Sequence, residues 1–186
     1  MLKTISEKII LKNKFHTICN NVIETESGKL GEHIIFGQHG NNETDGVSVL
    51  ALNDKGQVYI FREFRYGING YIWTIATGGC EKGLTIEENA AKELAEETDL
   101  QSEELQSIAI KTKNDPAIKN VNVNYYIAKN CIPIEGEIKS DDTESFMDGQ
   151  WVEIDDLVEK ILSGELEFSL YSLPVIFYYY QKTKGL

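Results

Sequence analysis

The amino-acid sequence predicts a single α/β domain built around a mixed β-sheet. Two observations support this fold class: strand-like stretches dominate the first third of the chain, and helical patterns follow between and after further strands. Strands before and between helices are typical of a mixed-sheet α/β domain. The chain of 186 residues, 41% hydrophobic and 26% charged, is long enough and apolar enough for one core.

The first elements are strands joined by turns. We expect these strands at residues 16–24, 30–37, 46–53 and 57–64. A Glu-Ser-Gly signal lies between the first two, and an Asn-Asp-Lys-Gly signal lies between the last two. The chain therefore begins with two pairs of strands connected by turns.

The strongest helical signal begins at Thr85. Thr85 and Glu88 form a capping-box pattern, with Thr85 as N-cap and Glu88 at the third helical position. Four residues then give this helix a small apolar side: Ala90, Ala91, Leu94 and Ala95. The remaining expected elements are strands at 105–112 and 121–128 and helices around 154–163 and 172–182.

The acidic composition restricts the partners of the protein. Lys and Arg total 18 against 30 Asp and Glu, which gives a formal net charge of −12. Such a surface repels phosphate backbones, so we expect no nucleic-acid partner and no membrane partner. The three cysteines form no Cys-x-x-Cys pair, and no export signal or long apolar run is visible, so we expect a cytoplasmic protein.

Three carboxylates lie close together on the predicted helix. At about 100° per residue, Glu93 and Glu97 are separated by about 40° around the axis, and Glu96 lies about 60° to the other side of Glu93. Like charges at this spacing destabilise a helix, and anions near its C-terminus are disfavoured. A hard cation such as Mg²⁺ would relieve the repulsion. A solvated acidic face is the alternative for this helix taken alone.

A glycine-rich loop, Gly-Gly-Cys-Glu-Lys-Gly at residues 78–83, precedes the acidic helix. Loop and helix together resemble the Nudix box of the Nudix hydrolases, with the pattern G-x5-E-x7-R-E-U-x-E-E-x-G-U, where U is aliphatic. The positions that match are Gly78, Glu93, Leu94, Glu96, Glu97 and Leu100. The resemblance implies a Nudix-type α/β/α sandwich with a mixed β-sheet.

Three positions depart from the box. Leu84 replaces the first Glu, Lys92 replaces the Arg, and Asp99 replaces the last Gly. In the family that Glu and Arg form an ion pair that braces the loop on the helix, and losing both partners can be nearly neutral. We expect Lys92 to pair with Glu88 instead, and Asp99 to adopt the left-handed conformation that closes the helix.

The resemblance extends beyond the box. Residues 45–50 and 58–67 resemble the strands before the box in ADP-ribose pyrophosphatase-like members, which place an arginine where Arg65 stands. The resemblance implies a Nudix domain at residues 45–186 and a strand-rich N-terminal extension at residues 1–44, read as one compact unit. Because such an extension commonly joins a dimer in this group, a homodimer is expected. Residues 74–78, Thr-Ile-Ala-Thr-Gly, replace the usual Glu-Leu-Pro-Ala-Gly approach to the box.

The resemblance also implies a metal site. Glu93, Glu97 and the backbone carbonyl of Thr77 would hold Mg²⁺ or Mn²⁺, and Glu96 would complete or bridge the cluster. Glu144, in an acidic run at residues 141–144, or failing it Glu96, would accept a proton from the attacking water.

The substrate side of the site follows from the same resemblance. Arg65 would position a phosphate, with Arg62 as the fallback, and Gly78 and Gly79 would also contact the substrate. Surface ion pairs are the alternative for both arginines. The implied reaction is divalent-metal-dependent hydrolysis of the pyrophosphate bond of a nucleoside diphosphate derivative, such as ADP-ribose or another nucleotide sugar. A catalytically weakened Nudix domain that binds a nucleotide or regulates a partner remains the alternative.

Overall fold

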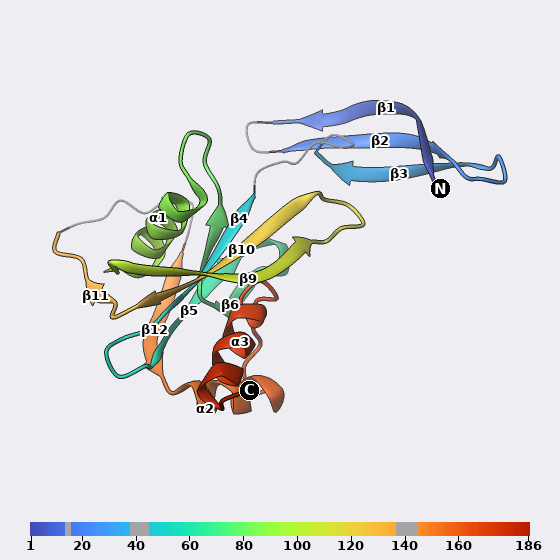
Figure 1. Ribbon diagram of the computed structural model, residues 1–186. Coiled ribbons are helices and arrows are strands. Elements are labelled where there is room, and N and C mark those ends of the chain that lie inside the picture. Colours follow the sequence, from blue (N-terminus) through green and yellow to red (C-terminus); the bar gives the residue numbers. More distant parts are fainter. Residues whose placement is uncertain (14–15, 38–44, 137–144) are drawn as a thin grey trace. The chain divides into compact units, whose positions relative to one another are not determined.

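The computed structural model describes residues 1–13, 16–37, 45–136 and 145–186 (Figure 1). The chain divides into two compact units. The N-terminal unit contains residues 1–45 and 112–122, and the main unit contains residues 46–111 and 123–186. Residues 112–122, which the sequence analysis placed in the Nudix domain, are therefore grouped with the N-terminal strands.

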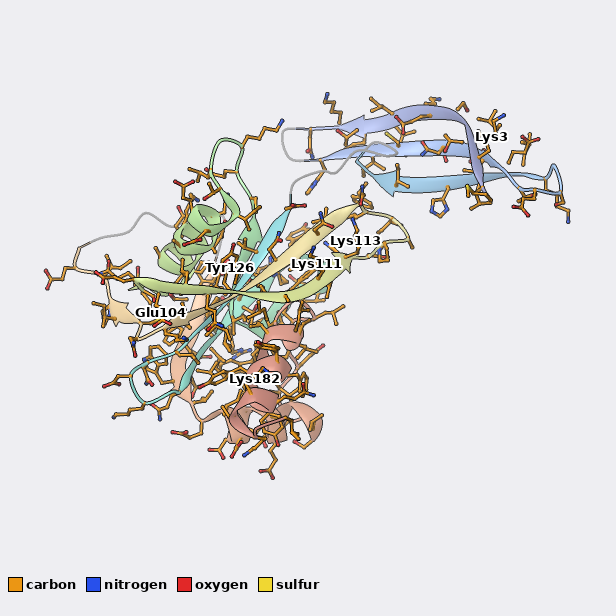
Figure 2. All side chains as sticks on the ribbon, viewed as in Figure 1. Lys3, Glu104, Lys111, Lys113, Tyr126 and Lys182 are labelled. Carbon is orange, nitrogen blue, oxygen red and sulfur yellow. The ribbon has the colours of Figure 1, made fainter. Side chains whose placement is uncertain are left out.

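The N-terminal unit is built on a three-stranded antiparallel sheet in the order β1-β2-β3. Its strands are β1 (Lys3–Lys12), β2 (Thr17–Glu24) and β3 (Leu30–Phe36). Gly28, with φ of 77°, makes the turn between β2 and β3 at the predicted signal. Residues 112–122 are attached to β3 through the N–H of Phe36, which donates to the carbonyl of Ile118 at 2.7 Å. Lys113, labelled in Figure 2, donates to Asn120 within that segment.

The main unit contains the predicted mixed sheet. Its order is β7-β4-β10-β9, with β4 parallel to β10 and antiparallel to β7. A three-stranded antiparallel sheet has the order β12-β5-β6, and β8 pairs with β11. The strands are β4 (Gly46–Ala51), β5 (Val58–Arg65), β6 (Gly70–Thr74), β7 (Ala76–Gly79), β8 (Leu100–Gln101), β9 (Glu104–Asn114), β10 (Val121–Lys129), β11 (Ile132–Pro133) and β12 (Phe146–Val152). A 3₁₀ turn, η1 (Tyr66–Ile68), joins β5 to β6.

Helices pack against both faces of these sheets in the main unit. They are α1 (Ile86–Thr98), α2 (Ile154–Leu162) and α3 (Leu173–Thr183), and Figure 1 shows α1 on the side away from α2 and α3. Strand β4 shows how the layers form. Val47 and Val49 belong to the core that packs on α1, whereas Leu50 belongs to the core that packs on α2 and α3. Alternating side chains of a strand point to opposite faces, so this arrangement is an α/β/α sandwich.

The aromatic run at residues 177–180 lies in α3 and packs against the core on that side. None of the helices in the described part of the chain has the length and apolar character needed to cross a membrane.

Candidate active site

Helix α1 begins and ends as the sequence predicts. The N–H of Glu88 donates to the Thr85 hydroxyl at 3.1 Å, and the N–H of Thr85 donates to the Glu88 carboxylate at 2.7 Å. These hydrogen bonds with Thr85 hold the pKa of Glu88 below its usual value. At the other end, Asp99 has φ of 55°, and its N–H donates to the carbonyl of Ala95. The helix that carries the acidic residues is thus fixed at both ends.

Glu97 connects α1 to strand β7. Its side chain is buried, and Oε2 accepts a hydrogen bond of 2.8 Å from the backbone N–H of Thr77. Thr77 itself is 9% exposed, and its hydroxyl oxygen has no hydrogen-bond partner among the described residues. The carboxylate of Glu97 therefore lies beside the residue whose carbonyl is the expected third metal ligand.

Glu93 lies against the next residue of the same strand. A Cβ atom added to Gly78 would be 2.1 Å from Cδ of Glu93 and 2.2 Å from one of its carboxylate oxygens. Only a residue without a side chain lets this carboxylate approach the strand so closely. Glu93 and Glu97 thus reach consecutive residues of β7, as their small angular separation on the helix predicts.

Glu96 contacts Lys92 of its own helix rather than strand β7. Lys92 Nζ donates a hydrogen bond to Glu96 Oε2 and lies 3.5 Å from Glu81 Oε1. The expected Lys92–Glu88 pair is therefore wrong, because the Glu88 carboxylate is engaged in the capping box. Burial alone would lower the pKa of Lys92, but the hydrogen bond to Glu96 and the neighbouring carboxylates raise it above its usual value.

Both candidate arginines take part in ion pairs. Arg65 lies 2.6 Å from the carboxylate of Glu63, a buried acid that the sequence analysis did not single out. Arg62 lies 3.2 Å from Asp148 and stacks over the ring of Tyr71 at 5.3 Å.

Arg62 and Arg65 point to opposite faces of β5, because side chains alternate along a strand. Arg65 shares its face with Tyr59, which packs against the core on the α1 side. Arg65 is therefore the better placed of the two to act with α1.

Gly79 and Glu144 are the remaining predicted site residues. Gly79 follows Gly78 in β7, is exposed, and lies opposite Gly46 of β4. Glu144, together with the rest of the acidic run at residues 141–144, lies outside the described residues. Its expected role as general base stays a prediction.

The donor groups fit a hard divalent cation. In residues 1–13, 16–37, 45–136 and 145–186, no three His, Cys, Asp or Glu side chains are gathered as in a preformed metal centre. The candidate set is instead two carboxylates, of Glu93 and Glu97, with the backbone carbonyl of Thr77. All three offer oxygen, the donor that Mg²⁺ and Mn²⁺ prefer, and Mg²⁺ keeps several waters in such sites. The side-chain-free space at Gly78 that admits Glu93 is the structural observation that supports this fit.

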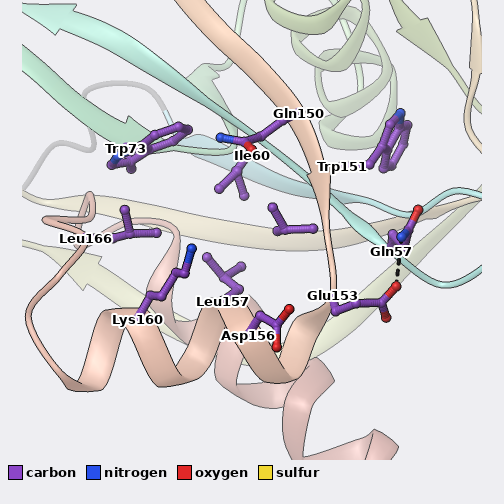
Figure 3. A pocket seen from close by; sticks show the side chains of 11 residues that line it. Gln57, Ile60, Trp73, Gln150, Trp151, Glu153, Asp156, Leu157, Lys160 and Leu166 are labelled. Carbon is purple, nitrogen blue, oxygen red and sulfur yellow. Dashed lines mark hydrogen bonds between the residues drawn. The ribbon is translucent and has the colours of Figure 1, made fainter.

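A cavity of about 350 Å³ lies between α2 and strands β5, β6 and β12 (Figure 3). Its lining includes Trp73, Gln150 and Lys160, and Gln57 donates to Glu153 at its rim. Ile60 and Leu157 of this lining belong to the core beneath α2 and α3. The cavity is therefore on the other side of the sheets from α1, and the acidic residues of the helix do not line it.

Comparisons with known proteins identify the family and the fold. The family model of the NUDIX domain matches residues 42–170, more than half of the chain. The ADP-ribose pyrophosphatase of Bacillus subtilis (strain 168) is 27% identical over 164 residues, covering 88% of this chain and 85% of that protein. A solved structure described as an ADP compounds hydrolase superimposes with a TM-score of 0.76 at 16% identity, covering 99% of this chain and 95% of that one, so the two share a fold. The loop and helix at residues 78–100 and the family match lead to one conclusion: the chain belongs to the NUDIX domain family of pyrophosphohydrolases.

Proposed function

We propose that this protein hydrolyses the pyrophosphate bond of a nucleoside diphosphate linked to another moiety, with ADP-ribose or another nucleotide sugar as substrate. The observation that carries the proposal is the approach of Glu93 and Glu97 to consecutive residues of β7. The similarity to an ADP-ribose pyrophosphatase supports the substrate class. Mg²⁺ or Mn²⁺ would be held by Glu93, Glu97 and the carbonyl of Thr77.

The bound cation would neutralise the pyrophosphate charge and lower the pKa of a coordinated water. The protein's own part is to hold the ligands still and to take up a proton. The N–H of Thr77 fixes the Glu97 carboxylate against β7. Lys92 Nζ donates a hydrogen bond to Glu96, so one carboxylate oxygen of Glu96 already has a partner. We therefore assign the proton acceptor to Glu144, with Glu96 as the second choice.

Arg65 would hold a phosphate of the substrate. A guanidinium has five N–H donors in a fixed fork, so an Arg65 anchored on one side by Glu63 still offers donors to a phosphate. About half of the Arg65 side chain is exposed, whereas that of Glu63 is almost fully buried. Glu63 thus serves as the anchor and Arg65 as the exposed contact.

We also propose that the protein is a cytoplasmic homodimer. Its three cysteines are free thiols, as in a reducing compartment. The N-terminal unit exposes many large apolar side chains, and such a surface marks a protein–protein interface. They are Met1, Leu2, Ile5, Ile9, Ile10, Leu11, Leu30 and Ile34.

A substrate panel tests the proposed reaction. Purified protein would be incubated with ADP-ribose, other nucleotide sugars and dinucleoside polyphosphates, with Mg²⁺, with Mn²⁺ or with a chelator. Phosphate released after phosphatase treatment is the readout. We expect metal-dependent turnover of at least one nucleotide sugar. Binding of metal and nucleotide without hydrolysis of any compound would favour the non-catalytic alternative.

A further inference from the structure

Asn89 is a fully buried polar residue on α1. Its side chain forms hydrogen bonds with the backbone of the loop that precedes the helix. Its Oδ1 accepts a hydrogen bond of 2.7 Å from the backbone N–H of Glu81. Its Nδ2 donates to the carbonyl of Thr85 at 2.8 Å and lies 3.5 Å from that of Leu84. The side chain is 0% exposed, so these bonds are made away from water, where an unsatisfied amide would destabilise the fold.

The loop has a second attachment that begins at the same residue. Glu81, whose N–H is held by Asn89, places its carboxylate 3.5 Å from Lys92 Nζ. Lys92 in turn donates to Glu96. Leu84, three residues after Glu81, is apolar and 40% exposed, so it offers no charge to Lys92. The hydrogen bonds of Asn89 and the ion pair of Glu81 with Lys92 thus both attach the loop to the helix.

We propose that Asn89 is a positioning residue of the active site. Its amide fixes residues 81–85 on α1, and through Glu81 and Lys92 it determines where the carboxylate of Glu96 lies on the helix that also carries Glu93 and Glu97. Asn89 touches neither substrate nor metal. With the loop fixed, the ammonium of Lys92 stays between Glu81 and Glu96, which keeps negative charge balanced next to the metal ligands. This inference rests on the proposed function of that site.

The test compares Asn89→Ala with Ser172→Ala. Ser172 is a matched control because it is also 0% exposed and also accepts a hydrogen bond from a backbone N–H, that of Ile75. Both substitutions remove a buried side-chain acceptor from a backbone N–H, so both should lower stability. Ser172 is the N-cap of α3, and its hydroxyl bonds with Thr74 and with the N–H of Ile75.

The first measurement is hydrogen exchange in the metal-free protein. We expect the amide of Glu81 to exchange at least about tenfold faster in Asn89→Ala, and to be unchanged in Ser172→Ala, because exchange follows local opening. The second is the affinity for Mn²⁺, followed by electron paramagnetic resonance without substrate. Supporting residues around metal sites typically contribute a factor of about 10 to 100 in affinity, so Asn89→Ala should bind Mn²⁺ about tenfold more weakly.

One result would overturn the proposed role of Asn89, and another would overturn the proposed metal site. If Asn89→Ala loses stability but keeps both the Glu81 exchange rate and the Mn²⁺ affinity of the wild type, Asn89 is only a core residue and the inference is overturned. If the wild type binds no Mn²⁺, the proposed metal site is overturned instead. The exchange comparison needs no metal, so it still decides whether Asn89 holds the loop.

Discussion

In the proposed metal site, Glu97 would contribute through its charge rather than through its shape. An amide at this position can still accept the hydrogen bond from Thr77 N–H, but it is neutral and binds hard cations weakly. Glu97→Gln should therefore lower turnover by at least about a hundredfold, which corresponds to roughly 2.7 kcal/mol of transition-state stabilisation. Steady-state kinetics measure the loss, and far-UV circular dichroism should stay unchanged. Activity within about threefold of the wild type would overturn the assignment.

Gly78 offers a way to disturb the site without changing any carboxylate. In Gly78→Ala the new methyl group would occupy the space of the Glu93 carboxylate, which must then move away from β7. The displaced group is the end of a flexible side chain, so we expect metal-free stability to change by no more than about 0.5 kcal/mol.

The metal-induced melting shift is the readout for Gly78→Ala. If the proposed site binds Mn²⁺, linkage should stabilise the wild type by about 2.7 kcal/mol at a hundredfold excess of Mn²⁺ over its dissociation constant. Gly78→Ala should lose most of this stabilisation. Gly67→Ala is the control, because nothing lies within 4 Å of a Cβ placed there. An equal shift in both variants would show that Glu93 is not a ligand.

At the scale of single elements, the capping box of α1 makes a pH-dependent contribution. The pKa of Glu88 is lowered in the folded state by its hydrogen bonds with Thr85. Its stabilising effect is therefore present above the unfolded pKa of a glutamate and is lost as the pH falls through the lower folded pKa.

Thr85→Ala removes the cap, and such losses typically destabilise by about 1 kcal/mol. Denaturant unfolding of wild type and Thr85→Ala at a series of pH values measures the difference. We expect the difference to be largest near neutral pH and to shrink in acid. A difference that is constant with pH would mean that Glu88 does not take part.

The elements that the sequence predicted well are those with local signals. Helix α1 begins at a capping box and ends at a residue in the left-handed conformation. Both ends can be predicted from residues that are close together in the sequence. Strand β7 was not predicted, because its four residues include two glycines and it exists through pairing with β4. The two-residue strands β8 and β11 likewise depend on a partner distant in sequence.

The geometry of the candidate site could likewise be predicted only where local spacing decides it. Helical spacing places Glu93 and Glu97 on one face, and the structure directs both to β7. The partner of Lys92 could not be chosen from spacing, since Glu88 and Glu96 are both four residues away, and the capping box decides between them. The buried Glu63 and Asn89 gave no signal, because their roles depend on burial and on contacts made only in the fold.

At the scale of the whole molecule, the proposed dimer predicts the mass in solution. Light scattering at micromolar concentration should report twice the 21.0 kDa of one chain. Leu30→Lys with Ile34→Lys places two charges on exposed apolar positions of β3 and should weaken association. Leu162→Lys, at an exposed apolar position of α2, is the control and should leave the mass unchanged. A wild-type protein that is monomeric at this concentration would contradict the proposal.

The grouping of residues 112–122 with the N-terminal strands has a consequence for dissecting the protein. The chain passes between the two units three times, near residues 45, 111 and 122, so no single cut separates them. A protein begun at residue 46 would keep residues 112–122 but lose the N–H of Phe36 and the imidazole of His33 that bond to Ile118 and Ala117. Such a truncation would leave only part of the N-terminal unit in the protein. Deleting residues 1–45 and 112–122 together would remove that unit as a whole.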